Sequence, residues 1–406
     1  MACVAAGGCS SGSPAATSVV ASTVASTVAS TVASTVASRA AAIPQPLQMI
    51  IDHPDAPTDD TVEVFICDVP LPTNDPIFGD LPLRLTLDPA VVAGQMEAGV
   101  RPYFEALSHG LYHPHFIAGQ VLSMSTDETH DECADRALDA SSPDATIVMV
   151  VATAEDVAAE SGGWGRPGTP CADDPCPAST TRRATYVGAS DFYGADDPGH
   201  VGTTPLLDLI EHEIGHTLDL PHSGFLGVQY TSTLDLMSDS AAPRDAQPER
   251  IDAQDTLGIN RVSLGWLPPS AVAVADRGGG SFTLAPSTGG RGTRLLVLPI
   301  DDLQFLTVEL LPATGFDDFL PNGGVATHLI DQRPTACGRD VDAQPCTGVD
   351  RGQTVVVTDT DHDELIDRAG ATIDYGVAPN HWTIVLRNDI TASTQTAEVE
   401  VHTTDG

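Results

Sequence analysis

The sequence contains no lysine: all 18 of its basic residues are arginine, against 56 acidic residues, and the formal net charge is −38. So negative a surface repels nucleic acid and anionic lipid. We therefore expect no nucleic-acid partner and no membrane binding through charge. Solubility is the simplest explanation of the acidic excess, and bound Ca²⁺ would also reduce the self-repulsion.

Charge is also absent from the first 38 residues, where Arg39 is the first charged position. Valine recurs every fourth residue from Val20 to Val36, in a repeat that is half Ser and Thr. Such a repeat is too polar for a membrane span, and one valine per turn gives a helix little to bury. We interpret residues 1–46 as the remains of a signal followed by a low-complexity spacer.

The stretch AAGGCSSGSP resembles the lipobox of bacterial lipoproteins, although Ala6 stands where leucine is usual. The resemblance implies that Cys9 carries the lipid. A signal peptide needs a basic segment and an apolar run of about 7 to 15 residues, so we expect the start codon to lie upstream. The prediction is an extracytoplasmic bacterial protein, secreted or held at the cell surface by an N-terminal lipid anchor; an unstructured cytosolic tail is the alternative.

No CxxC spacing occurs, which argues against a zinc–thiolate site. Besides Cys3 and Cys9 the chain has an even number of cysteines, as expected for disulfides in an oxidising compartment. Proximity in sequence favours three pairs: Cys171–Cys176, Cys337–Cys346 and, by elimination, Cys67–Cys133.

Two regions follow the spacer, and together they predict an α+β fold. Residues 47–270 mix helix and strand patterns, while residues 271–406 carry short strand patterns between turn residues, which indicates a β-sandwich. In the first region we expect strands at 61–69, 114–124, 145–153 and 184–192, helices at 89–108 and 130–140, and a surface loop at 160–183. In the second we expect strands beginning near residues 281, 293, 305, 325, 354, 381 and 397.

The motif HEIGH places His212 and His216 one helical turn apart, about 6 Å along the axis, so both imidazoles can reach one zinc ion. Glu213 stands beside the first histidine and can take a proton from water activated by the metal. Thr204 and Pro205 suit the N-cap and first position of this helix.

A third ligand must come from beyond the helix. Asp219 lies seven residues, about 10.5 Å, from His212 and cannot share its ion. Pro221 ends the helix, so Asp219 is expected in a left-handed conformation that costs roughly 1 kcal/mol. That turn would bring His222 back to the metal. A glutamate from a later segment, with Glu249 the nearest, is the alternative.

HEIGHTLDLPH matches the metzincin pattern HExxHxxGxxH except at Asp219, where the family has glycine. Met237 in TSTLDLMSDS, fifteen residues after His222, resembles the Met-turn of that clan. VRPYFEALSHGLY, LPHSG, LDLMS and INRVSLGWLPP resemble the gametolysin and immune inhibitor A-like branch. The resemblance covers residues 60–270, most strongly 205–270. No tyrosine stands two residues after Met237, so the extra tyrosine ligand of astacin-like relatives is not expected there.

The resemblance implies a monomeric zinc endopeptidase acting on protein or peptide substrates, with His212, His216 and His222 as ligands and Glu213 as general base. The alternative is a zinc-containing surface adhesion module that has lost activity. Cys67 could also inhibit the enzyme by binding zinc as a thiolate, but a disulfide with Cys133 is the preferred interpretation. A Ca²⁺ loop at Asp359, Asp361 and Asp363 lacks the expected glycine and glutamate, so a solvated turn is preferred. The four histidines without ligand spacing are expected in surface or core roles: His109, His113, His115 and His200.

Overall fold

The structure is a computed structural model that describes residues 47–48, 58–70, 74–75, 79–80, 85–154, 162–168, 182–192, 205–225, 228–331, 352–355, 364–376, 380–391 and 393–403. All of these residues belong to one compact unit, residues 40–406. The predictions for Cys9, for the spacer and for the cysteines at 171, 176, 337 and 346 lie outside the described residues. In the described part of the chain, no helix is long and apolar enough to cross a membrane.

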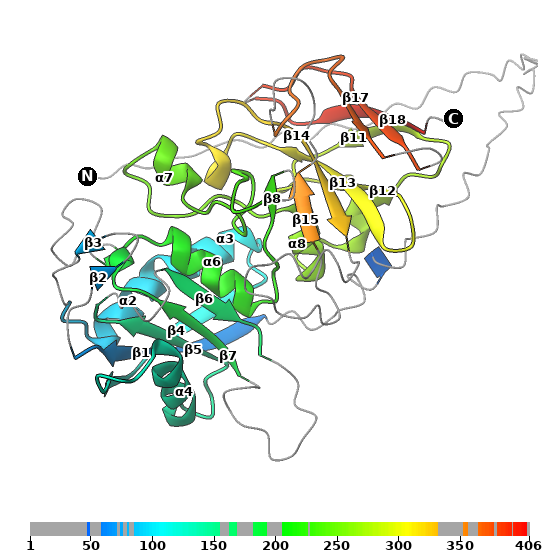
Figure 1. Cartoon of the computed structure of the whole chain (residues 1–406). Helices are drawn as coiled ribbons and strands as arrows, with labels where there is room; N and C mark the ends of the chain where they lie inside the picture. The colour runs from blue at the N-terminus through cyan, green and yellow to red at the C-terminus, as the bar shows by residue number, and fades with distance from the viewer. Residues whose placement is uncertain are drawn as a thin grey trace, which may run out of the picture. The chain divides into compact units, whose positions relative to one another are not determined.

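A five-stranded mixed sheet forms the first part of the fold (Figure 1). Its order is β4-β1-β5-β7-β6; the first four strands are parallel, and β6 runs antiparallel to β7. The strands are β1 (Asp59–Asp68), β4 (His113–Ser123), β5 (Ile147–Ala152), β6 (Gly163–Arg166) and β7 (Arg183–Val187). Every residue of β5 is buried, as expected for a central strand with both faces covered.

Helices cover both faces of this sheet. Helices α2 (Pro89–Ala98), α3 (Val100–Leu107) and α6 (Asp208–Thr217) share one core with it, and α4 (His130–Ala140) shares a second core on the opposite face. Thr129 and Glu132 form a reciprocal capping box at the start of α4. The predicted disulfide between Cys67 of β1 and Cys133 of α4 is confirmed.

The single helix expected at 89–108 is two helices, because the chain breaks at Gly99. A Cβ at Gly99 would lie 2.3 Å from Leu207 Cδ1, so the glycine permits close approach of the segment leading into α6. Two further expectations need correction. The strand expected at 184–192 ends at Val187, before the 3-10 helix η1 (Ser190–Phe192), and the loop expected at 160–183 contains strand β6.

The second part of the fold consists of two mostly antiparallel sheets, with orders β10-β12-β13-β14-β15-β8-β9 and β11-β18-β17-β16. Apolar residues of both sheets meet in a common core that includes Leu306, Leu329, Ile384 and Val399. The larger sheet contains β8 (Gly224–Phe225), β9 (Val228–Gln229), β10 (Val272–Val274), β12 (Leu295–Pro299), β13 (Gln304–Leu311), β14 (Gly324–Asp331) and β15 (Gly352–Val355), and the smaller one β11 (Gly280–Leu284), β16 (Thr372–Tyr375), β17 (Trp382–Leu386) and β18 (Ala397–Thr403).

All seven strands expected after residue 270 are present, and the sequence pattern missed β10 and β16. The remaining elements are short: β2 (Asn74–Asp75), β3 (Gly79–Asp80), α7 (Ala242–Ala246), α8 (Gly258–Ser263), η2 (Pro269–Ala271) and η3 (Gly315–Asp317). The chain is therefore α+β, as predicted, with a helix-covered mixed sheet followed by mostly antiparallel sheets.

Buried hydrogen bonds connect residues on either side of position 270. The Glu309 carboxylate accepts from the Gly258 amide at the start of α8, and Asp317 accepts from the Asp255 amide. Glu364 accepts from Ser232 Oγ at 2.9 Å. The segment that follows α6 is thus held by groups from the β-rich part, and the division of the chain near residue 270 stays a prediction.

Candidate metal centre

Helix α6 begins at Asp208, three residues later than the sequence suggested. The Leu206 amide donates to Asp191 O, and the amides of Leu207 and Asp208 both donate to Ile251 O, at 2.8 and 3.0 Å. Backbone carbonyls therefore satisfy amide groups at the helix start that a side-chain cap usually takes. Pro205 precedes the helix, and the proposed cap Thr204 lies outside the described residues.

Asp208 occupies the first turn of α6, where negative charge complements the helix dipole. Burial raises the pKa of this carboxyl group, whereas its ion pair with Arg244 opposes the rise. Two nitrogens of Arg244 donate to Asp208 Oδ2, at 3.1 and 2.8 Å. Charge neutralisation by Arg244 thus permits an acidic residue in a nearly buried helix start.

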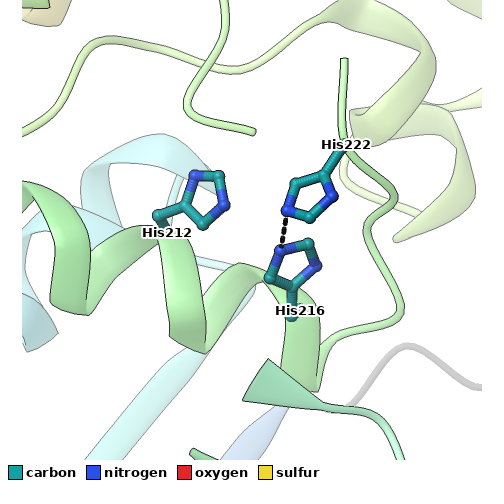
Figure 2. A group of neighbouring side chains, drawn as sticks. All are labelled: His212, His216 and His222. Carbon is teal, nitrogen blue, oxygen red and sulfur yellow. Dashed lines mark hydrogen bonds between the residues drawn. The ribbon is translucent and has the colours of Figure 1, made fainter. Parts of the chain in front are cut away.

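The metal-binding motif lies on the buried part of α6. His212 is 3% exposed and Glu213 is 4% exposed, while His216 is partly buried one turn later. Ile210 and Ile214 belong to the core under the sheet, so they fix the rotation of the helix about its axis. This rotation directs both histidines toward the same point (Figure 2).

The helix ends in a hydrogen-bonded turn that includes Asp219. Its φ is 64°, in the left-handed region, as predicted. The Asp219 amide donates to His216 O at 3.0 Å, and the Leu220 amide donates to Gly215 O at 3.2 Å. These are the two bonds of a Schellman motif, which glycine usually completes. Aspartate therefore preserves the turn, and the chain reverses direction directly after the helix.

The reversal brings His222 against the two helical histidines (Figure 2). His216 Nε2 and His222 Nε2 are 2.6 Å apart, and the ring centroids of His212 and His222 are 5.3 Å apart. One nitrogen from each ring lies within 4.8 Å of the others, so the three form a group that could hold a metal ion. Among the described residues this is the sole such group of His, Cys, Asp and Glu side chains.

Backbone carbonyls orient the two helical rings. His212 Nδ1 is 2.8 Å from Leu236 O, and His216 Nδ1 is 2.8 Å from Leu220 O. A proton on each Nδ1 leaves Nε2 unprotonated as the ligand atom, which is the usual arrangement for metal-binding histidines. Burial lowers the pKa of His216 well below its usual value, and the neighbouring His222 and His212 lower it further. The neutral imidazole that a metal requires is therefore favoured.

Met237 lies fully buried against the same helix. A Cβ at Gly215 would be 2.5 Å from Met237 Sδ, so glycine is needed for this close packing. The Met237 carbonyl accepts from the Ser223 amide at 2.9 Å, next to His222. The Met237 segment thus contacts the ligand helix through its side chain and the third histidine's segment through its backbone.

Asp235 holds the Met237 segment in place through buried hydrogen bonds. It is fully buried and accepts from Ser223 Oγ at 2.6 Å and from Thr256 Oγ1 at 2.9 Å. Asn260 of α8 donates to it as well. Burial raises the Asp235 pKa, and these hydrogen bonds oppose the rise. Asp235 therefore links the segments after His222 and before Met237 to α8.

Strand β6 lies directly against Glu213 and His216. A Cβ at Gly163 would be 2.8 Å from Glu213 Cγ, and a Cβ at Gly165 would be 2.6 Å from His216 Cβ. The alternating glycines therefore leave the helix-facing side of β6 without side chains. Trp164, between them, packs against Tyr186 on the opposite side of the sheet.

The motif analysis missed Tyr230. Its hydroxyl oxygen is 2.8 Å from His222 Nε2, and its ring centroid is 4.4 Å from that of His222. The hairpin of β8 and β9 returns the chain to the histidine, and no fixed sequence spacing signals this return. No tyrosine ligand was expected, because Asp239 stands two residues after Met237, where astacin-like relatives have tyrosine.

Other candidates lie away from the cluster. Glu249 is exposed and does not join the described metal-binding group, so a glutamate third ligand at that position is wrong. His113 and His115 contact Glu105 and Glu97 instead. His109 is on a turn with positive φ. Asp359, Asp361, Asp363 and His200 lie outside the described residues.

Three imidazole nitrogens with oriented rings fit Zn²⁺, which binds histidine readily, and the neutral state of His216 supports this donor set. No protein-family model matches the sequence, and no curated protein matches it.

Proposed function

We propose that this chain is a zinc-dependent endopeptidase of the metzincin type, and that residues 47–270 form its catalytic region. The observation that carries the proposal is the convergence of His212, His216 and His222, with Glu213 next to His212 on helix α6. Asp219 in the left-handed turn and Met237 against Gly215 agree with the expected arrangement around such a centre. The shared core of the two following sheets supports a β-sandwich for residues 271–406.

A bound zinc ion would polarise the substrate carbonyl and lower the pKa of attacking water toward about 7. Glu213 would be the group that takes a proton from the attacking water and passes it to the leaving amine. Glu213 is buried and lies against Gly163 of β6, which limits the positions open to its side chain. The chain thus supplies a glutamate as the base and three histidine ligands.

The sheet edge favours a peptide substrate. Strand β6 is the last strand of the five-stranded sheet in the described part of the chain, and it contacts the helix at Glu213 and His216. An extended peptide can add to such an edge through main-chain hydrogen bonds, which are independent of side-chain sequence. This addition would place a peptide carbonyl beside the histidine cluster.

The variant Glu213→Gln tests the proposal. It should bind about one zinc per chain, like the wild type, and hydrolyse peptides at least about 10²-fold more slowly, because the general base is lost. The matched control is Glu249→Gln, which changes an exposed glutamate outside the cluster. Wild-type activity in the Glu213 variant would refute the assigned base.

A zinc-containing adhesion module without activity is the second candidate, and Tyr230 favours it specifically. Structural zinc sites are closed by four protein ligands, and the Tyr230 oxygen lies beside a ligand nitrogen. Digestion of a denatured protein or a peptide library, with and without a chelator, separates the two. Chelator-sensitive cleavage supports the enzyme, whereas zinc binding without cleavage supports the module.

The expected setting is extracytoplasmic, as a monomer that is secreted or lipid-anchored through Cys9. The disulfide between Cys67 and Cys133 supports an oxidising compartment. Mass spectrometry of the mature protein from a bacterial host tests the anchor: a diacylglyceryl group on Cys9 would establish it, and an unmodified thiol there would exclude it.

A further inference from the structure

Tyr230 brings an oxygen atom to the histidine cluster. Its hydroxyl lies 2.8 Å from His222 Nε2 and 3.2 Å from His222 Nδ1. The ring centroids of Tyr230 and His212 are 6.0 Å apart, so the tyrosine faces the cluster and not the β-rich core. Since His216 Nε2 is also 2.6 Å from His222 Nε2, two other potential ligand atoms lie close to this nitrogen.

The chain holds Tyr230 there at an energetic cost. Its φ is 59°, in the left-handed region, which is unfavourable for a bulky side chain. The side chain is 41% exposed, so burial of the ring does not offset this cost in full. A strained backbone at a cluster of ligand atoms points to a role in the site.

Neighbouring groups fix the backbone in this position. Pairing of Gly224 with Gln229 closes the hairpin, and a Cβ at Gly224 would be 1.9 Å from Val228 O. The Tyr230 amide donates to Ser223 O at 3.3 Å, next to His222. This hydrogen bond fixes the backbone of Tyr230 next to the backbone of His222.

The oxygen lies over the face of the His222 ring. It is close to both ring nitrogens, and in the ring plane it would clash with Cε1, so the in-plane lone pair of Nε2 remains directed at the cluster. Two ligands of one tetrahedral zinc ion are separated by about 3.3 Å, given bonds of about 2.0–2.1 Å. The oxygen is 2.8 Å from His222 Nε2, so coordination requires it to move from the ring face toward the cluster.

We propose that the phenol oxygen of Tyr230 is a fourth protein ligand of the metal ion held by His212, His216 and His222. This inference rests on the proposed zinc site and deepens it. Zinc can expand to five-coordinate, so a water position is compatible with four protein ligands. The inference therefore holds for both the enzyme and the inactive module.

Copper substitution tests the ligand directly, because a phenolate bound to Cu²⁺ gives a visible charge-transfer band that histidine ligands do not give. The full chain, freed of metal with a chelator, is titrated with Cu²⁺ and separately with Zn²⁺ against a competing chromophoric chelator. Tyr230→Phe keeps the ring and removes the oxygen. Tyr375→Phe, in strand β16 of the four-stranded sheet, is the matched control.

We expect the visible band in the wild type and in Tyr375→Phe, its loss in Tyr230→Phe, and a zinc affinity at least about tenfold weaker in Tyr230→Phe. A wild type that binds one metal ion without the band, or a Tyr230→Phe that keeps the band, overturns the ligand assignment and leaves the histidine site intact. A wild type that binds no metal overturns the zinc site itself. The two failures are thus distinguishable.

Discussion

Met237 Sδ lies 2.5 Å from the point where a Cβ of Gly215 would stand, and Gly215 immediately precedes the ligand His216. The contact fixes the distance between the Met237 segment and the helix. Leu236 O, in the same segment, accepts a hydrogen bond from His212 Nδ1. A shift of Met237 would therefore also shift the His212 ring.

Gly215→Ala should destabilise the protein by about 1–3 kcal/mol, since the added methyl group overpacks a rigid contact. Gly94→Ala is the matched control, because Gly94 also lies within a helix but has no atom within 4 Å of its Cβ position. It should be neutral or stabilising by up to about 1 kcal/mol. Urea unfolding of both variants provides the comparison, and equal stabilities would contradict the packing argument.

Asp219→Gly should stabilise the protein by up to about 1 kcal/mol, because glycine adopts the left-handed conformation without a Cβ penalty. The zinc content should stay the same, since the turn that positions His222 is retained. Asp219→Ala keeps the penalty and is the comparison. An alanine variant as stable as the glycine variant would show that this turn is not strained.

The disulfide between Cys67 and Cys133 joins residues 66 positions apart. A loop of that length corresponds to about 4 kcal/mol of stabilisation in the chain-entropy treatment. The double variant Cys67→Ala with Cys133→Ala should lose a large share of this value in chemical denaturation without reductant. Unfolding free energies equal to those of the wild type would rule out a stabilising disulfide.

Stability should depend on pH through Glu309. Burial raises its pKa to about 8, although the Gly258 amide and Arg261 act to lower it and Asp235 and Asp255 act to raise it. A raised pKa means that the folded state holds the proton more tightly. The stabilisation is therefore complete below the ordinary pKa of about 4.3 and is lost as pH rises to about 8, with a slope of up to about 1.4 kcal/mol per pH unit.

Glu309→Gln removes this titration and keeps an acceptor for the Gly258 amide. The stability of the wild type relative to the variant should fall between about pH 4.5 and pH 8, as measured by urea unfolding at several pH values. Glu398→Gln, at an exposed position of β18, is the control. A difference between wild type and Glu309→Gln that does not vary with pH would contradict the assignment.

Patterns within one element were sufficient to predict much of the fold. The apolar run of β5 and the spacing of His212 and His216 depend on local periodicity, and the structure has both as expected. The left-handed turn at Asp219 also followed from the sequence, because Pro221 forbids continuation of the helix.

Contacts between distant segments explain what was missed. The break at Gly99 reflects the approach of Leu207, and the late start of α6 reflects the carbonyl of Ile251. Strand β6 is rich in glycine, which has low strand propensity, and it forms through pairing with β7. Tyr230 reaches the site through a hairpin. Such contacts are set by tertiary structure and leave no local periodicity.

The carboxylates of Glu309, Asp317 and Glu364 make the segment before residue 270 depend on the residues that follow it. A shortened chain ending near residue 270 would lose the acceptors of the Gly258, Asp255 and Thr233 amides at once. It would also expose Leu257 and Ile259, which share a buried core with Leu295 and Phe305, and burial of one such side chain contributes about 1.5–3 kcal/mol. The histidine-bearing half should therefore fail to fold when produced alone, whatever its catalytic competence in the intact molecule.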